Sequence, residues 1–472
     1  MRASRPLAFL GKFDRVPRGI RSGFVDARGS AYSSAASALP VALQEIPEAL
    51  PPLSIMPNSL LLRSYFVTSV LASPRILRIC LPVMMRIANS QSRLLNPDRN
   101  PVLHFFVRKL MYEHFAAGEN GSEVKKTITS MKQMGFRGVI LGYAKEVSVT
   151  EDLALQMVST TSEKSDPTDP IIQAYFQGTI KTLSLVGAGD FLAIKFSGGG
   201  PSVLEALAHN KPPPPDFLEG MHRVCEAAVK QNTRIWIDAE QQDIQGAIDA
   251  WSIDLMRNYN RDGKTVVYTT MQAYLKHTPD NILRHLKLAQ AEDWALGIKL
   301  VRGAYIHTEE RGLIHNTIDD THKAYDTIVN NILTRSWPGV PSDKAYPRVQ
   351  LFLASHNKDS INKAYATQTS LIQAGKPTVE LEYGQLQGMA DEVSCSLLQL
   401  CQTVQPAGSD VSKLSLAPKS FKCLAWGTTQ ELLQFLLRRL KENKDALSRT
   451  EHWVIGFRQE IWRRIKKFSY LS

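Results

Sequence analysis

The sequence has little of what marks metal, disulfide and nucleotide-loop proteins. Its 472 residues include only five cysteines, an odd number at irregular spacing, with no CxxC and no HExxH pattern. A disulfide framework and a metal site are therefore not expected. The stretch GAGD (187–190) precedes a strand-like run instead of a helix, and GGG (198–200) lacks the Lys-Ser/Thr of a P-loop. Neither of the usual phosphate-binding loops is present.

A long uncharged apolar run is also missing. Residues 59–89 are the most apolar region, but Arg63, Arg75, Arg78 and Arg86 interrupt it. No stretch reaches the roughly 18 residues that a membrane-spanning helix needs, so this region predicts one or two buried or surface-lying helices. Apolar residues make up 43% of the chain and charged residues 21%. These fractions exclude wholesale disorder and a fibre, and they are typical of a globular protein.

Acidic residues are scarce at the N-terminus. Residues 1–40 hold seven Lys or Arg and two Asp, and Ser and Ala dominate 29–39. This composition is typical of a mitochondrial transit peptide, with a plain disordered tail as the alternative. Its removal would lower the net charge from +11 to +6. Because that modest excess is scattered and no RNA-binding aromatic motif is present, a nucleic-acid partner is not expected.

Eight short β-rich runs alternate with longer helical stretches from about residue 136. Their continuous apolar character indicates strands buried on both faces, as in parallel sheets. Eight such units predict an α/β fold, a (β/α)8 barrel, with a doubly wound open sheet as the alternative. The runs are GVILGYA (138–144), FLAIKFS (191–197), RIWIDAE (234–240), TVVYTTMQAY (265–274), GIKLVRGAY (297–305), VQLFLASHN (349–357), VELEYGQL (379–386) and SFKCLAWG (420–427).

The rest of the chain divides around this barrel, which we assign to residues 136–447. Residues 41–135 predict a helical N-terminal arm, in which the Pro-rich segment 47–57 predicts a linker and apolar spacing predicts helices over 102–135. Residues 448–472 predict a basic amphipathic C-terminal helix. Such a helix either lies on a membrane or packs on its own domain.

Many of the apolar runs end in polar side chains. In a barrel these ends meet at one face, so their repetition favours a shared site over simple solvent exposure. The endings are Lys195, Asp238 with Glu240, Gln272, Arg302 with Tyr305, His356 with Asn357, and Gln385.

Two adjacent arginines follow the eighth run on a predicted helix. Glu442 lies four residues after Arg438 and three after Arg439, within contact distance on a helix face. One interpretation is a solvated ion-paired face, which contributes little to stability. The other is a clamp for a carboxylate, whose two oxygens match the forked donors of guanidinium groups.

Six of these segments, in this order, resemble the proline dehydrogenase family in its mitochondrial fungal-type form. The resemblance implies a distorted (β/α)8 TIM-like barrel that binds FAD without a Rossmann fingerprint. It implies oxidation of L-proline to Δ1-pyrroline-5-carboxylate, with hydride passing from substrate C5 to flavin N5 and electrons passing to membrane quinone. It also implies peripheral contact with the matrix side of the mitochondrial inner membrane. The segments are WIDAE (236–240), MQAYL (271–275), KLVRGAY (299–305), ASHN (354–357), GQLQGMAD (384–391) and RRLKEN (438–443).

The resemblance also implies roles for individual residues. Asp238 would orient Lys195 and Tyr305, and Glu442 matches the acid of the double-arginine helix. Residues expected to bind the substrate carboxylate are Lys195, Arg438 and Arg439, and those expected to pack on its ring are Leu300 and Tyr305. Residues expected to contact the flavin or its phosphates are Gln272, Lys299, Arg302, Gly303, Ser355 and His356.

One position departs from the family pattern. Cys423 stands where the best-known members carry a tyrosine that closes over the substrate. Loss of this tyrosine enlarges the pocket near the ring and removes a hydrogen-bond donor, and a hydroxyproline-preferring branch of the family also lacks it. The alternatives are therefore a hydroxyproline-preferring enzyme, or a cysteine that is an inert core thiol.

Two other classes of function compete with this interpretation. A cofactor-free barrel lyase would use Lys195 or Lys299 to form a Schiff base. A non-enzymatic basic protein would bind a mitochondrial membrane or nucleic acid through scattered Lys and Arg.

Overall fold

The computed structural model describes residues 50–144, 169–342, 345–404, 416–442 and 451–469. Leu50–Ser472 forms one compact unit. The predicted transit peptide, residues 1–40, lies outside the described residues.

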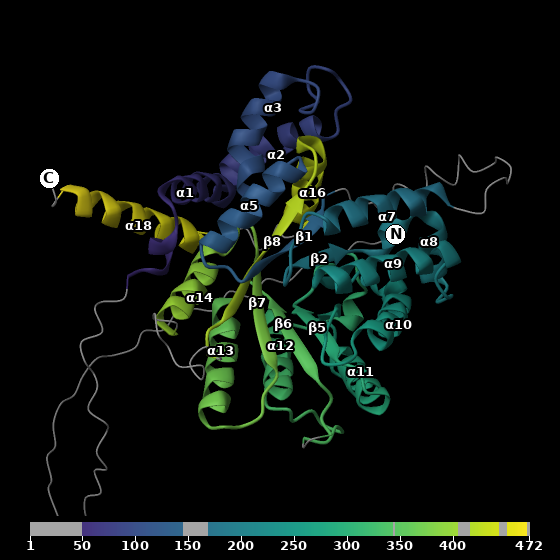
Figure 1. Cartoon of the computed structure of the whole chain (residues 1–472). Coiled ribbons are helices and arrows are strands. Elements are labelled where there is room, and N and C mark those ends of the chain that lie inside the picture. Colours follow the sequence, from purple (N-terminus) through teal and green to yellow (C-terminus); the bar gives the residue numbers. More distant parts are fainter. Residues whose placement is uncertain (1–49, 145–168, 343–344, 405–415, 443–450, 470–472) are drawn as a thin grey trace, which may run out of the picture. The chain divides into compact units, whose positions relative to one another are not determined.

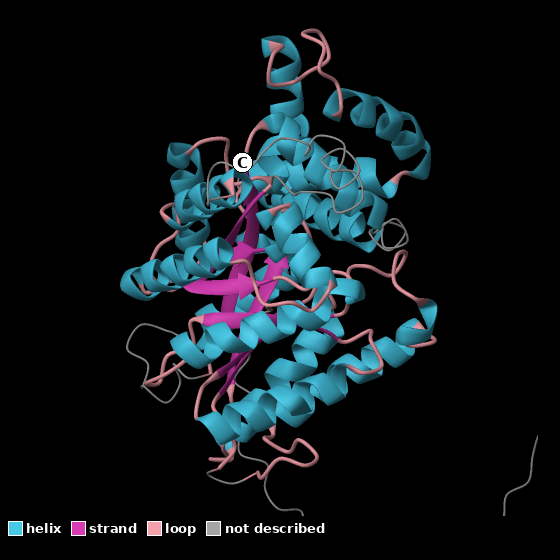
Figure 2. Cartoon of the chain, turned by 90° about the vertical axis from the view of Figure 1, so that its right-hand side faces the viewer, coloured by secondary structure: helices cyan, strands magenta, loops and turns pink. Residues whose placement is uncertain are grey.

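Eight parallel strands close into a barrel in chain order, β1 to β8, with β8 paired to β1. The expectation of a (β/α)8 barrel is confirmed, and the open doubly wound sheet is wrong. Figure 2 shows the strands at the centre with helices around them. The strands are β1 Gly138–Tyr143, β2 Phe191–Ile194, β3 Arg234–Ile237, β4 Val267–Gln272, β5 Leu296–Val301, β6 Val349–Ala354, β7 Glu380–Leu386 and β8 Lys419–Trp426.

Each strand is followed by at least one helix, as right-handed parallel connections require. The second connection carries a 3-10 turn, η3, and two helices, and the fifth carries a short 3-10 turn, η4. The elements are α7 Pro170–Leu183, η3 Phe196–Gly199, α8 Pro201–Ala208, α9 Pro215–Gln231, α10 Gln242–Tyr259, α11 Thr278–Glu292, η4 Arg311–Leu313, α12 Ile318–Leu333, α13 Lys358–Gln373, α14 Asp391–Val404, α16 Thr429–Glu442 and α18 Glu451–Ser469.

Alternation along the strands separates two cores. One set of side chains faces the helices and forms the large outer core. The alternate set fills the barrel with Ile140, Phe191, Trp236, Tyr268, Phe352 and Phe421, all nearly or fully buried. Because successive strand residues point to opposite faces, the β-rich runs had to be apolar on both. This aromatic filling closes the lower part of the barrel and leaves its carboxyl end for a site.

A buried ion pair lies among these aromatic rings, at the start of β3. The Arg234 guanidinium lies 2.6 Å from Glu382 and 3.8 Å from the centroid of the Phe191 ring. Both charged side chains are largely shielded from water, so the pair depends on mutual neutralisation.

The N-terminal arm consists of helices, as expected for 102–135. Within the arm, Arg108–Tyr112 forms a π-helical segment and Ala116 bridges to Ala425 of β8. No single described helix is long and apolar enough to span a membrane; α1 and α2 pass that test only as a pair bent by 94°. The elements are η1 Pro52–Ile55, α1 Asn58–Ala72, α2 Pro74–Ala88, α3 Pro101–Val107, η2 Arg108–Tyr112, α4 Glu113–Phe115 and α5 Gly121–Gln133.

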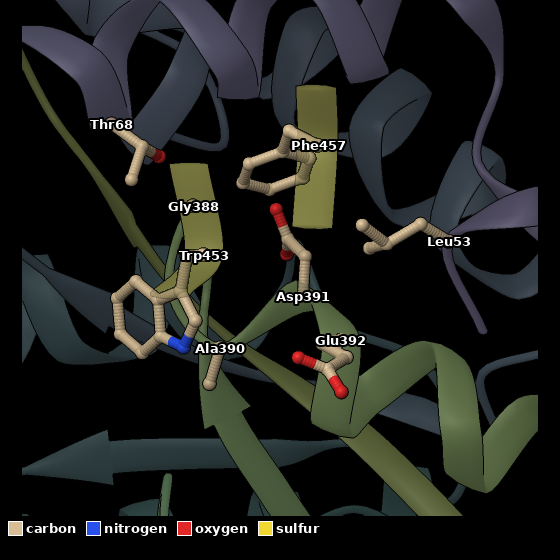
Figure 3. A pocket seen from close by; sticks show the side chains of 8 residues that line it. All are labelled: Leu53, Thr68, Gly388, Ala390, Asp391, Glu392, Trp453 and Phe457. Carbon is tan, nitrogen blue, oxygen red and sulfur yellow. The ribbon is translucent and has the colours of Figure 1, made fainter. Parts of the chain in front are cut away.

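The Pro-rich segment expected as a linker is packed against the rest of the unit at Leu53 and Met56. Leu53 and Met56 are buried in a small cluster that also contains Phe457 of the C-terminal helix α18. A cavity of about 10 Å³ lies at this junction. Figure 3 shows Asp391 in its wall, with Phe457 above it and Leu53 to its right. This space holds no more than about one water molecule. Residues of the arm, of α14 and of α18 line it, so these three parts of the structure meet here.

Candidate active site

A cavity of about 690 Å³ lies at the carboxyl ends of the barrel strands. Residues of α7 and α16 line it together with the ends of β1, β2 and β8. This volume falls within the range of roughly 300–1,000 Å³ found for small-molecule sites. Six of the eight residues predicted for the substrate line it: Lys195, Asp238, Tyr305, Cys423, Arg438 and Arg439.

Four cations line the cavity, and three of them, Lys195, Arg438 and Arg439, were predicted from the sequence. Lys195 follows β2, and its carbonyl accepts a hydrogen bond of 2.9 Å from the Tyr175 hydroxyl, which fixes the backbone there. Arg438 and Arg439 lie on α16, where the Arg439 guanidinium is 5.6 Å from the centroid of the Phe435 ring. These groups make the cavity a positive site suited to a small carboxylate.

Asp238 directly follows β3 and pairs with Lys299 of β5. The Lys299 ammonium group lies 2.5 Å from Asp238 Oδ1 and 4.4 Å from the centroid of the Trp236 ring. The Tyr305 hydroxyl has a different partner and donates a 3.4 Å hydrogen bond to the Ala239 carbonyl. The structure therefore joins the predicted substrate set to the predicted flavin set through the Asp238–Lys299 pair.

A buried carboxylate that sequence reasoning left without a role also lines the cavity. Glu240 is 5% exposed, and its Oε1 accepts a 3.0 Å hydrogen bond from the backbone N–H of Ser197. Burial raises the pKa of Glu240, although the Lys195 ammonium group opposes that rise. The sequence signal was its spacing, because it follows Asp238 by two residues and extended residues two apart share a side.

Tyr305 lies in the field of these charges. Burial raises the pKa of its hydroxyl to about 12, and the cations Lys195 and Arg439 act against that rise. The hydroxyl is therefore protonated at neutral pH and available as a hydrogen-bond donor.

Cys423 of β8 lies in the cavity wall, opposite Ile140 of β1 and Leu386 of β7 in the strand register. Burial raises the pKa of its thiol to about 12, so the thiol is neutral. A neutral thiol is small and only weakly polar, whereas a tyrosine here would fill more of the cavity and donate a strong hydrogen bond. This location favours an effect on the pocket over the alternative of an inert core thiol.

The predicted flavin residues gather at the ends of β4, β5 and β6, with Arg302 at their centre. Its guanidinium donates hydrogen bonds of 2.7 Å to Ser355, 2.8 Å to Ser360 and 3.1 Å to His322. It also lies 4.3 Å from the centroid of the Tyr325 ring. The result is a fixed cation in a ring of hydroxyl and imidazole groups.

Gln272 connects this group to the cavity. Its amide nitrogen donates a 3.3 Å hydrogen bond to the Glu240 carbonyl, and its amide oxygen accepts one of 3.3 Å from Ala304. Gly303 between these segments has φ +154°, and a Cβ there would lie 2.3 Å from the Tyr274 ring. Only glycine permits this close approach of the chain.

His356 lies at the same end of the barrel, past β6. Its Nε2 accepts a 3.1 Å hydrogen bond from the backbone N–H of Leu386. Burial, aided by the charge of Lys422, lowers the pKa of His356 to about 4. The ring is therefore neutral at physiological pH.

Of the predicted substrate residues, Leu300 and Glu442 are not among those that line the cavity, and none of the six predicted flavin residues lines it either. Leu300 of β5 is fully buried in the outer core, on the opposite face of the strand from Lys299. Glu442 ends α16, and its side chain lies outside the described residues.

An aromatic pair in the cavity wall was missed altogether. The rings of Tyr143 and Trp426 lie 5.1 Å apart, and the Lys181 ammonium group lies 5.3 Å from the Trp426 ring centroid. These residues belong to three elements far apart in the chain, and no local pattern marks them. Their proximity follows only from barrel closure between β1 and β8.

Within the described residues, one group of possible metal ligands comes together, in the arm. Asp98, His104 and Glu119 hold ligand atoms within 4.8 Å of one another. Glu119 is engaged by Arg108 at 2.7 Å and accepts a hydrogen bond from the backbone N–H of Thr429 at the start of α16. Through these contacts Glu119 links the arm to the start of α16. Asp98, His104 and Glu119 are not among the residues that line the cavity.

The fold and the site together define a barrel enzyme with a cavity at the carboxyl ends of its strands, lined by four cations and two carboxylates. A family model described as proline dehydrogenase matches residues 124–452. The chain therefore belongs to the proline dehydrogenase family, as its motifs indicated.

Individual relatives agree with this assignment. The chain is 29% identical over 412 residues to a probable mitochondrial proline dehydrogenase of Schizosaccharomyces pombe, covering 76% of this chain and 80% of that protein. It is 30% identical over 259 residues to hydroxyproline dehydrogenase of Rattus norvegicus, covering 52% and 51%.

A solved structure shows the same fold. Proline utilization A from Bdellovibrio bacteriovorus, inactivated by N-propargylglycine, superposes with a TM-score of 0.57 at 12% identity. The superposition covers 82% of this chain, which spans about two fifths (40%) of that longer protein.

Proposed function

We propose that the chain oxidises L-proline to Δ1-pyrroline-5-carboxylate, with FAD as cofactor and a membrane quinone as electron acceptor. The observation that carries this proposal is the cavity shared by Lys195, Arg438 and Arg439 at the mouth of a barrel of this family. Its cations suit the carboxylate of proline, which stays negatively charged at neutral pH.

The chain's own residues bind and orient the substrate. Arg438, Arg439 and Lys195 bind the carboxylate, while Tyr305 and Cys423 border the ring. This turns a bimolecular encounter into a positioned one, which lowers the barrier by several kcal/mol. The same cations disfavour a second positive charge, so they favour loss of the proton from the ring nitrogen.

The second residue group fits a flavin. Lys299 and Arg302 offer cations, Gln272 offers an amide and Ser355 a hydroxyl, and Gly303 leaves the backbone without a side chain. Such donors match the carbonyl, ring-nitrogen and phosphate oxygen groups of FAD. The chemistry that FAD supplies when bound is acceptance of a hydride from substrate C5 at its N5 atom.

Flavin spectroscopy tests this function. The purified full-length chain is expected to carry flavin absorbance near about 450 nm that L-proline bleaches without oxygen. A correctly folded chain that binds no flavin, or a bound flavin that proline leaves oxidised, would contradict the proposal.

A hydroxyproline substrate is the second candidate. It is favoured by the small Cys423 in the cavity wall and by the similarity to rat hydroxyproline dehydrogenase. Side-by-side reduction of the flavin by L-proline and by trans-4-hydroxy-L-proline decides between them.

The lyase alternative has less support. Lys299 is held by Asp238 at 2.5 Å, and the family is one of dehydrogenases. Borohydride trapping of a carbonyl substrate on Lys195 or Lys299 would revive it.

We also propose a mitochondrial location, with residues 1–40 as transit peptide and the mature protein on the matrix side of the inner membrane. The support is the acid-poor N-terminus and the mitochondrial relative. N-terminal sequencing of the mature protein tests the assignment, and an intact Met1 in purified mitochondria would contradict it.

A further inference from the structure

Exposed apolar side chains gather on α2, on α3 and on the loop between them. Six of them are each at least 54% exposed: Ile79, Val83, Leu94, Val102, Phe105 and Phe106. We call these residues and the arginines of the same segment the α2–α3 surface. Figure 1 shows α3 at the top of the compact unit, beyond the barrel. A solvent-facing apolar area of this kind marks a binding site for a protein or a membrane.

The same segment is strongly basic. Residues 74–107 hold five arginines and a single acid, Asp98. On α2, Arg75 and Arg86 lie four residues before and seven residues after Ile79, so helical spacing places them on its exposed face. Within the described part of the chain, no carboxylate forms an ion pair with Arg75 or Arg86.

The opposite side of α2 packs against the rest of the protein, so the exposed side chains are not part of the core. Ile87 and Ala88 of α2 pack with Val107 of α3 and with Leu433 and Leu437 of α16. The α2–α3 pair thus covers the outer side of α16, whose other residues line the cavity. The α2–α3 surface lies directly behind the helix that carries the arginine pair.

We propose that the α2–α3 surface is the part of this protein that binds an anionic lipid bilayer. A bilayer satisfies both properties of the surface, since its headgroups attract the arginines and its acyl region accepts the apolar side chains. A second copy of the chain does not, because it would bring the same positive charges against each other. The inference rests on the proposed membrane quinone, and it places the cavity one helix layer from the lipid that dissolves this acceptor.

The C-terminal helix is the competing surface. Ile455, Trp462 and Ile465 of α18 are exposed, and two of its five Lys and Arg residues are engaged within the protein. Arg463 and Arg464 both pair with Glu460 at 2.7 Å, and Arg464 also donates to backbone carbonyls of η1. Arg464 thus links the helix to the arm, while Arg458, Lys466 and Lys467 are exposed, so α18 is the surface with which the α2–α3 surface has to be compared.

Vesicle binding by the full-length FAD-loaded chain tests the proposal. The vesicles contain phosphatidylcholine with roughly 30% anionic phosphatidylglycerol. We expect Ile79→Glu with Val83→Glu to lower the partition coefficient at least about tenfold. We expect Arg75→Gln with Arg86→Gln to lower it about 30-fold, from the loss of two charges near the surface. The matched control, Ile455→Glu with Trp462→Glu on α18, is expected to bind like the unaltered chain.

Three outcomes would overturn the inference. In the first, the two α2 double variants (the arm variants) bind vesicles like the unaltered chain. In the second, only the α18 control loses binding. In the third, the arm variants change from dimer to monomer without any change in vesicle binding. Circular dichroism and flavin content establish that each variant is folded.

The proposed function is measured separately in the same samples. Proline is expected to bleach the flavin of the arm variants as in the unaltered chain, while turnover with a long-chain quinone in vesicles falls. Failure of proline to bleach the unaltered flavin counts against the proposed function alone, because vesicle binding does not depend on it.

Discussion

Replacing Arg438 with alanine removes one of the four cations that line the cavity. A hydrogen bond between charged groups contributes about 1.5–3 kcal/mol. Arg438 is only partly buried and shares its anion with Arg439 and Lys195, so we assign it the contribution of one such bond, about 1.5–3 kcal/mol. The expected loss in kcat/KM for L-proline is therefore about 10- to 150-fold, mostly as a higher KM.

Steady-state kinetics with a soluble electron acceptor measures this loss, and two controls isolate its cause. Pyrrolidine has the same ring without the carboxylate, so its kcat/KM is expected to be the same in Arg438→Ala and in the unaltered enzyme. Lys181→Ala removes another cation of the cavity, one that lies over Trp426, and is expected to leave the KM for proline close to normal. An unchanged KM for proline in Arg438→Ala, or an equal loss with pyrrolidine, would refute the reasoning.

Three further predictions follow from the geometry. Cys423→Tyr fills the ring end of the cavity, so the ratio of kcat/KM for L-proline to that for trans-4-hydroxy-L-proline is expected to rise about tenfold in kinetic assays. Glu382→Leu leaves the Arg234 guanidinium unpaired inside the barrel, and urea unfolding is expected to show a loss of about 3–5 kcal/mol. The folded-state pKa of His356 is about 4 against about 6.5 unfolded, so its contribution to stability, at most about 3 kcal/mol, is present above pH 6.5 and is lost as pH falls toward 4. His356→Gln is expected to flatten the unfolding free energy over that pH range.

Each of these predictions has a result that contradicts it. An unchanged substrate ratio in Cys423→Tyr would separate the thiol from ring selection. If the double variant Arg234→Met with Glu382→Leu is no more stable than Glu382→Leu alone, the unpaired charge is not the cause of the loss. A His356→Gln variant that keeps the full acid dependence would assign that dependence to other groups.

The barrel could be predicted because each strand carries its own signal. Runs such as RIWIDAE and VQLFLASHN are apolar on both faces and end in polar side chains, and barrel closure brings those ends together. This reasoning located Lys195, Asp238 and Tyr305, which line one cavity in the structure.

Other parts of the site depend on tertiary contacts that no local pattern contains. Tyr143, Lys181 and Trp426 meet only because β8 pairs with β1 and α7 packs beside them. Leu300 follows Lys299 directly in its motif, yet strand alternation turns it toward the helices. A motif therefore identifies a segment, while strand parity decides which of its side chains face the cavity.

The segment from Leu50 was misjudged for a similar reason. Proline composition predicts a break in regular structure, and the 3-10 turn η1 agrees with that. Composition does not reveal that Leu53 and Met56 have a partner, which here is Phe457, some 400 residues later in the chain. Long-range burial of this kind is not visible in a local pattern.

The central claim is that the cavity between α7 and α16 holds a cyclic imino acid by its carboxylate. A crystal structure of the FAD-loaded chain with pyrrole-2-carboxylate tests this most directly, because that ligand keeps the ring and carboxylate but has no hydride to give. We expect its carboxylate within about 4 Å of the Arg438 and Arg439 guanidinium groups, with the ring beside Tyr305 and Cys423. A ligand bound elsewhere, or one whose carboxylate faces away from both arginines, would contradict it.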